Sequence, residues 1–255
     1  MLCLPKQKWD TSFLSDLNFQ TRNCGFYNKK NWDKKMSLLR KIINFKKSFI
    51  RNHGVNNHVF LIDENGKRRE IHRLNSSQIK FIGNNNTIEI YAPVGDLVLD
   101  IKVFDNTKII LNPSQHTRKI AIYGFNNKNN SIIFGRDFSS TDVVKILLLR
   151  GNGNIVIGDD CMFAYNDIIQ MGDGHAIYSK NSKKPINDNK DIIIGNHVWV
   201  AADALILKGA KVSDNSIVGI KSVVTKSFDD TNVILAGIPA KVVKTDISWT
   251  RDSQY

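Results

Sequence analysis

Between residues 194 and 224 an aliphatic side chain recurs at every sixth position: Ile194, Val200, Ile206, Val212, Val218 and Val224. A short side chain stands two residues before each of the last five, at Val198, Ala204, Ala210, Ser216 and Ser222. This spacing matches neither an α-helix nor a strand with alternating side chains. It is typical of a parallel β-helix, in which each six-residue unit forms one short side of a coil. We therefore predict an all-β fold whose aliphatic residues point into the coil and whose short residues pack at its corners.

Short runs rich in strand-forming residues precede this region, at 79–82, 87–91, 97–104, 108–111, 119–123, 131–134, 143–149 and 155–157. Turns rich in Asn and Gly separate them, and both residues tolerate the positive φ that a sharp corner needs. The runs that begin at Thr87, Ser131 and Asn154 are interpreted as one position in successive coils, although the register of the coils before residue 155 stays open. We predict a β-helix domain over 58–245 and a tail over 246–255 whose Trp249 packs on the coils.

Residues 1–57 hold 12 Lys or Arg and 3 Asp or Glu, a balance of +9 out of +12 for the whole chain. Asp33 is a candidate N-cap for a helix, and Leu38, Ile42, Phe45 and Phe49 recur at the spacing of an apolar stripe. We predict a basic, partly helical segment that caps an open end of the β-helix. Recruitment of an anionic acceptor and contact with a membrane surface remain alternatives.

No stretch approaches the roughly 20 apolar residues of a membrane span, and no secretory signal is expected at the N-terminus. The three cysteines, Cys3, Cys24 and Cys161, lack the spacing of a disulfide framework or a metal site. A reducing compartment is therefore expected, which indicates a cytoplasmic protein, with the inner face of the membrane as a second location.

A polar stretch at 171–190 interrupts the repeats, and a long loop inside a compact repeat is usually functional. His175 stands near its start between glycines and other small residues, in the sequence Gly-Asp-Gly-His at 172–175. Histidine titrates near neutral pH, so His175 is the candidate general base. His197 lies within a regular repeat, where we expect it to point outward without a catalytic role.

The segments 173–179 (DGHAIYS), 192–199 (IIIGNHVW), 223–228 (VVTKSF) and 236–244 (AGIPAKVVK) resemble the left-handed β-helix, or hexapeptide-repeat, acyltransferases. They are most similar to bacterial capsule O-acetyltransferases that act on polysaccharides containing sialic acid. The resemblance covers about 155–250. It implies a left-handed β-helix, acetyl-CoA as co-substrate, and a homotrimer with active sites between neighbouring chains.

By the same resemblance, His175 takes the proton of a sugar hydroxyl, and the indole of Trp199 lines the acetyl site and stabilises the oxyanion. The implied coenzyme A contacts are Trp199, Ala202, Gly219, Ile220, Thr225, Lys226, Pro239 and Lys241. Main-chain groups of Ala202, Ile220 and Thr225 would meet the pantetheine arm, and Lys226 and Lys241 the phosphates. The sequence departs from many relatives at Ala201 and Ile220, and has Lys241 where arginine is frequent.

The expected function is transfer of an acetyl group to a hydroxyl of an anionic bacterial surface polysaccharide, with no metal and no nucleic acid partner. The alternative is an N-acetyltransferase that acts on an amino-sugar nucleotide or another small acceptor, and a Gly-x-Gly-x-x-Gly turn that would favour a nucleotide-sugar enzyme is absent from 1–57. A zinc-binding β-helix needs clustered histidines, and only His175 and His197 lie past residue 116. A non-catalytic solenoid is the remaining alternative. The sugar and the hydroxyl stay unidentified.

Overall fold

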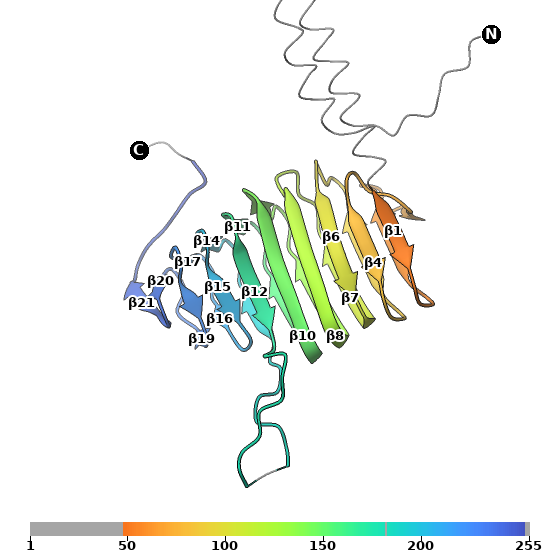
Figure 1. Ribbon diagram of the computed structural model, residues 1–255. Coiled ribbons are helices and arrows are strands. Elements are labelled where there is room, and N and C mark those ends of the chain that lie inside the picture. The colour runs from red at the N-terminus through yellow and green to blue at the C-terminus, as the bar shows by residue number, and fades with distance from the viewer. Residues whose placement is uncertain (1–47, 182, 253–255) are drawn as a thin grey trace, which may run out of the picture. The chain divides into compact units, whose positions relative to one another are not determined.

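The computed structural model describes residues 48–181 and 183–252, which form a parallel β-helix of three sides (Figure 1). Asp33, Leu38, Ile42 and Phe45 of the predicted helical stripe lie outside the described residues, as do Cys3 and Cys24. Phe49 lies in the first strand, so the parallel strands begin ahead of residue 58, where we expected the domain to start. Among the described residues, no helix could span a membrane.

The first side of the β-helix stacks strands that pair in parallel from coil to coil. It comprises β1 (Phe49–Asn52), β4 (Gln78–Phe81), β6 (Val98–Val103), the first half of β8 (Lys119–Phe134), the first half of β10 (Val143–Ile157), β12 (Asp167–Met171), β15 (Leu205–Leu207) and β18 (Val223–Val224).

The second side continues each coil past what we call the first corner. It comprises β2 (His58–Ile62), β5 (Thr87–Tyr91), β7 (Asp105–Leu111), the second halves of β8 and β10, β13 (Ile192–Ile194), β16 (Lys211–Val212) and β19 (Ser227–Phe228). The hairpin strand β3 (Arg68–Glu70) pairs antiparallel with β2.

The third side lies between the second corner, which follows the second side, and the third corner, which leads to the next coil. It comprises β9 (Ser139–Ser140), β11 (Met162–Phe163), β14 (Trp199–Val200), β17 (Ile217–Val218) and β20 (Ile234–Gly237), with β21 (Ala240–Lys244) folding back antiparallel. The described part of the chain is thus an all-β, left-handed β-helix, as predicted, and the predicted helical segment lies outside it.

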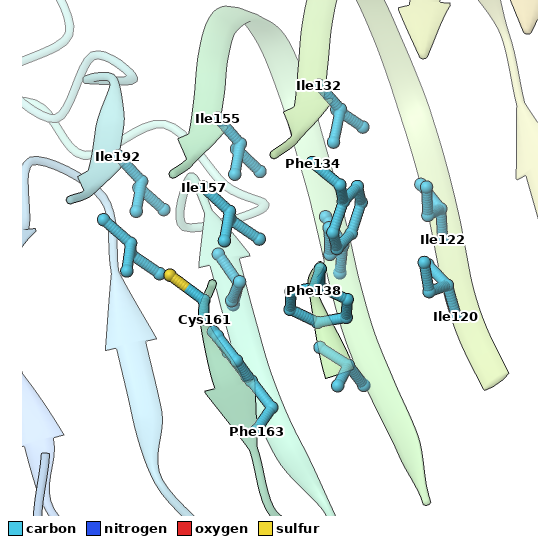
Figure 2. Packing of buried hydrophobic residues seen from close by; sticks show 14 of the residues in the cluster. Ile120, Ile122, Ile132, Phe134, Phe138, Ile155, Ile157, Cys161, Phe163 and Ile192 are labelled. Carbon is cyan, nitrogen blue, oxygen red and sulfur yellow. The ribbon is translucent and has the colours of Figure 1, made fainter. Parts of the chain in front are cut away.

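The aliphatic residues of the hexapeptide repeat all point into the coil, which confirms the prediction from their spacing. Each of the six is at most 1% exposed, and the five short residues that precede them are buried as well. Figure 2 shows the same inward packing in the preceding coils. There the ring of Phe138 lies between those of Phe134 and Phe163, at centroid distances of 4.9 and 5.2 Å respectively. Each such burial contributes roughly 1.5–3 kcal/mol to the stability of the folded chain.

The Asn-rich turns have two physical roles at the first corner. Asn85, Asn106 and Asn126 adopt positive φ, as expected for sharp turns. Other polar residues of the same turns are buried and form a ladder between coils, in which the side chain of Asn57 accepts from Asn86 and that of Asn86 accepts from the amide of Thr107. Thr87, Ser131 and Asn154 do share one column of the sheet. However, Lys108 stands between Thr87 and Ser131, so these two are not in successive coils as we interpreted them.

Candidate active site

The loop between β12 and β13 leaves the β-helix at the first corner and extends away from the coils (Figure 1). Gly172 opens it with a φ of 92°, and a Cβ there would lie only 2.2 Å from the carbonyl oxygen of Leu149 in the preceding coil. Glycine is therefore required where the loop departs, because any side chain would collide with backbone.

The two arms of the loop are held together by Asp173, Asn187 and Lys208. The ammonium of Lys208 lies 2.5 Å from a carboxylate oxygen of Asp173 and donates to the carbonyl oxygens of Asn187 and Asp188. The side-chain amide of Asn187 donates to Asp173 and to the carbonyl oxygen of His175. The hydrogen bond from Lys208 holds the pKa of Asp173 below its usual value, so this carboxylate is charged at neutral pH. No periodic pattern in the sequence indicates this brace.

His175 is fixed through its backbone and free at its side chain. Its carbonyl oxygen accepts from Asn187 at 2.8 Å, and its side chain is exposed. Within the described part of the chain, the imidazole makes no hydrogen bond or ion pair. A histidine held in this way presents its ring nitrogens to solvent beside the brace, as a general base requires.

Trp199 lies on the third side, in β14, between Met162 and Ile217 of the neighbouring coils. Its ring is half-buried and lies 6.1 Å from the ring of Trp249. No residue among those described accepts a hydrogen bond from its indole N–H, whereas the indole of Trp249 donates to the carbonyl oxygen of His197 at 3.0 Å. The N–H of Trp199 is therefore a donor available to a ligand.

His197 is half-buried at the second corner, where the C-terminal tail crosses the coils. Its ring stacks on Trp249 with centroids 4.0 Å apart, and its Nδ1 lies 2.6 Å from Asp160. Arg251 reaches the other oxygen of Asp160 at 2.8 Å and the hydroxyl of Ser139 at 2.6 Å. Burial of Asp160 opposes ionisation, but the bonds from His197 and Arg251 prevail and lower its pKa. His197 thus anchors the tail, and Trp249 packs on the coils as predicted.

The residues predicted to contact coenzyme A lie at two different corners. Trp199 lies on the third side, and Ala202, Gly219 and Ile220 lie at the third corner that follows it. Pro239 lies in the turn after β20, and Lys241 lies in β21, which folds back beside β20. Thr225 and Lys226 lie instead at the first corner, past β18, on the edge that carries the His175 loop. The structure therefore divides the predicted site residues into two groups and does not unite them within one chain.

The residues at the third corner differ in how accessible they are to a ligand. Ala202 is buried and its carbonyl oxygen already accepts from the amide of Lys221 at 3.0 Å, whereas Ile220 is 62% exposed. In the first-corner group, the ammonium of Lys226 lies 5.3 Å from the ring centroid of Phe228. Among the described residues, no cluster of three or more His, Cys, Asp or Glu could hold a metal ion.

No protein-family model matches the chain. Over 124 residues the chain is 36% identical to the polysialic acid O-acetyltransferase of Escherichia coli O1:K1, a match that spans 49% of this chain and 39% of that protein. Over 177 residues it is 33% identical to the polysialic acid O-acetyltransferase of Neisseria meningitidis, spanning 69% of this chain and 81% of that protein. The chain therefore spans well under half the length of the first relative and most of the second.

The fold is also similar to a solved structure, that of the polysialic acid O-acetyltransferase OatWY. The similarity has a TM-score of 0.57 at 28% sequence identity, and covers 81% of this chain and 93% of that chain. Because it extends well beyond residues 155–250, it includes the earlier coils in which the sequence showed only strand runs and turns.

Proposed function

The chain belongs to the hexapeptide-repeat O-acetyltransferases, the family of the polysialic acid O-acetyltransferases, and on that premise we propose that it acetylates a capsular polysaccharide. The acetyl donor is acetyl-CoA, and the acceptor is a sugar hydroxyl of an anionic polymer. One observation carries the proposal: a braced loop presents the unpaired imidazole of His175 on a β-helix of this family.

In the proposed reaction, His175 accepts the proton of the sugar hydroxyl while the hydroxyl oxygen attacks the carbonyl carbon of the thioester. The C–S bond then breaks, and the thiolate of CoA takes the proton back from His175, so no covalent enzyme intermediate is needed. Holding both substrates in line supplies effective molarity, and the base contributes roughly 10²–10⁴-fold. The indole N–H of Trp199, which has no acceptor among the described residues, is suited to the oxyanion.

We further propose that the active site lies between two copies of the chain, in a homotrimer. His175, Thr225 and Lys226 share the first corner, whereas Trp199, Ala202 and Ile220 lie on the third side and third corner. A site that needs both groups is complete when the first corner of one copy meets the third side of the next, which is a head-to-tail contact that closes into a ring.

The test is incubation of the protein with acetyl-CoA and a panel of bacterial capsular polysaccharides, with polysialic acid among them, while free CoA is measured. His175→Ala should fold, still bind CoA, and lose kcat by about 10²–10⁴-fold. His197→Ala is the control, and it should reduce thermal stability more than turnover because His197 anchors the tail. Near-normal turnover in His175→Ala would refute the mechanism, and turnover only with an amine acceptor would favour N-acetylation.

A further inference from the structure

A groove of about 360 Å³ runs along the first corner, across three coils that precede the His175 loop. It is lined by residues that follow β6 and by the bends within β8 and β10, among them Phe104, Asp105, Asn126, Lys128, Arg150 and Gly151. None of these residues belongs to the catalytic or coenzyme A groups described above, so the groove needs its own explanation.

The groove is lined by two cations and one carboxylate, and neither cation is paired with a described side chain. Among the described residues, the side chains of Lys128 and Arg150 make no ion pair or hydrogen bond. Its one carboxylate, Asp105, accepts a hydrogen bond from the backbone amide of Asn84 at 2.7 Å. Unpaired cations converging on a concave surface concentrate anionic ligands there.

Phe104 lines the groove, and a third cation, Lys102, joins its ring to that of Phe125. Phe125 is 50% exposed, and the ammonium of Lys102 lies 5.6 Å from the ring centroids of both Phe104 and Phe125. An aromatic ring exposed beside polar donors suits the apolar face of a sugar, and the guanidinium of Arg150 suits a carboxylate, which it can bind with two parallel hydrogen bonds. The combination points to an acidic sugar rather than to a neutral one.

The groove is also joined directly to the loop that carries His175. The backbone carbonyl oxygen of Arg150 accepts from the side chain of Asn189, on the returning arm of the loop, at 2.5 Å. In Figure 1 the loop leaves the edge at which β8 and β10 turn. A chain that lies in the groove can therefore continue toward His175.

We propose that this groove is an acceptor subsite that binds carboxylate-bearing sugar residues of the polymer next to the residue being acetylated. The proposal rests on the proposed function and names how this chain selects an anionic acceptor. Lys128 and Arg150 bind the carboxylates, and Phe104 and Phe125 contact the sugar rings.

A second groove of about 370 Å³, which extends from the same corner onto the second side, supplies a matched control. Its cations are Arg68 and Lys108, and both are paired with Glu89, at 3.1 and 3.5 Å. The two grooves are similar in size and in number of cations, but only the first has charge available for a ligand. Replacing the cations of the second groove therefore changes net charge equally without removing a binding site.

The experiment measures binding of fluorescently labelled polysialic acid to the full chain by anisotropy, without acetyl-CoA. Lys128→Gln/Arg150→Gln should weaken binding at least tenfold, because two charge-assisted contacts are lost. Arg68→Gln/Lys108→Gln should weaken it less than twofold. Equal effects of the two pairs, or none from the first pair, would overturn the subsite. So would a single-stranded oligonucleotide that binds as tightly and responds to the same variant, because the groove would then be a general polyanion site.

A parallel assay of CoA release separates this proposal from the proposed function. Binding that depends on Lys128 and Arg150, without any CoA release on polysialic acid, supports the subsite and argues against the reaction. CoA release whose KM for the polymer is unchanged in the groove variant supports the reaction and overturns the subsite. Where CoA is released, the KM for acetyl-CoA of the groove variant should stay within twofold of the unmodified protein.

Discussion

At the scale of single residues, Trp199 and Trp249 are identical side chains whose indole N–H groups serve different purposes. That of Trp249 donates to the carbonyl oxygen of His197, and that of Trp199 meets no acceptor among the described residues. Trp199→Phe should therefore lower kcat by about 10–10³-fold with little change in thermal stability, because it removes an oxyanion donor. Trp249→Phe, the control, should lower stability and leave kcat within about threefold. Steady-state kinetics and thermal melts check both, and an unaffected kcat in Trp199→Phe would remove that indole from the reaction.

Asp167 is a buried carboxyl group with one oxygen unsatisfied. Its Oδ1 accepts from the amide of Ala204 at 3.0 Å, and within the described residues its Oδ2 has no partner. Burial raises its pKa to about 7, and nearby Asp203 adds to the rise, against the backbone hydrogen bonds from Ala204 and Ala164. Between about pH 4 and pH 7 the folded chain thus keeps a proton that the unfolded chain releases. The contribution of Asp167 to the free energy of unfolding therefore falls as the pH rises through this window.

Asp167→Asn removes this titration and keeps an oxygen that can accept from Ala204. The variant should gain stability relative to the unmodified protein on going from pH 5 to pH 8, by roughly 2.5 kcal/mol, because about two pH units of this range lie below the raised pKa of about 7 and each is worth about 1.4 kcal/mol. Urea unfolding at both pH values measures the difference. Parallel pH dependences in the two proteins would show that Asp167 titrates normally.

At the scale of elements, the loop between β12 and β13 owes its form to Lys208, which belongs to the following coil. Lys208→Met should lower kcat about tenfold and make the loop more susceptible to proteolysis, because Asp173, Asn187 and Asp188 lose their shared partner. The KM for acetyl-CoA should change little, and Lys208→Arg should restore part of the rate. Lys211→Met is the control, because within the described residues the side chain of Lys211 pairs with the exposed Asp229 alone. Equal kinetics of Lys208→Met and the unmodified protein would show that the brace has no positioning role.

The brace acts over the whole neutral range. The pKa of Asp173 is lowered, chiefly by Lys208, so its contribution to stability is present above the ordinary pKa of 3.8. It is lost only as the pH falls through the lower pKa of the folded state. A loss of activity near pH 6 should therefore not come from protonation of Asp173 and opening of the loop.

At the scale of the whole molecule, periodic contacts could be predicted from the sequence and non-periodic contacts could not. Ile194 and its successors were predictable as inward residues because a fixed spacing records the geometry of the coil. The pairing of Asp160 with Arg251 was not, because it joins residues 91 positions apart outside any repeat. The separation of Trp199 from His175 could not be predicted either, because sequence spacing does not show at which corner of the β-helix a loop departs. Lys208 also escaped prediction, since a lysine within a repeat resembles any solvated lysine.

The separation of the two groups of site residues makes a quantitative prediction about assembly. If each active site takes His175 from one copy and Trp199 from the next, two inactive variants can complement each other. His175→Ala and Trp199→Phe chains, co-expressed at equal levels, should form mixed oligomers in which about one quarter of the sites carry both native residues, since each partner is intact in half of the cases. CoA release in the mixture should therefore approach a quarter of the rate of the unmodified protein, well above that of either variant alone. If both residues acted within one chain, every site would lack one of them, and mixing would restore nothing.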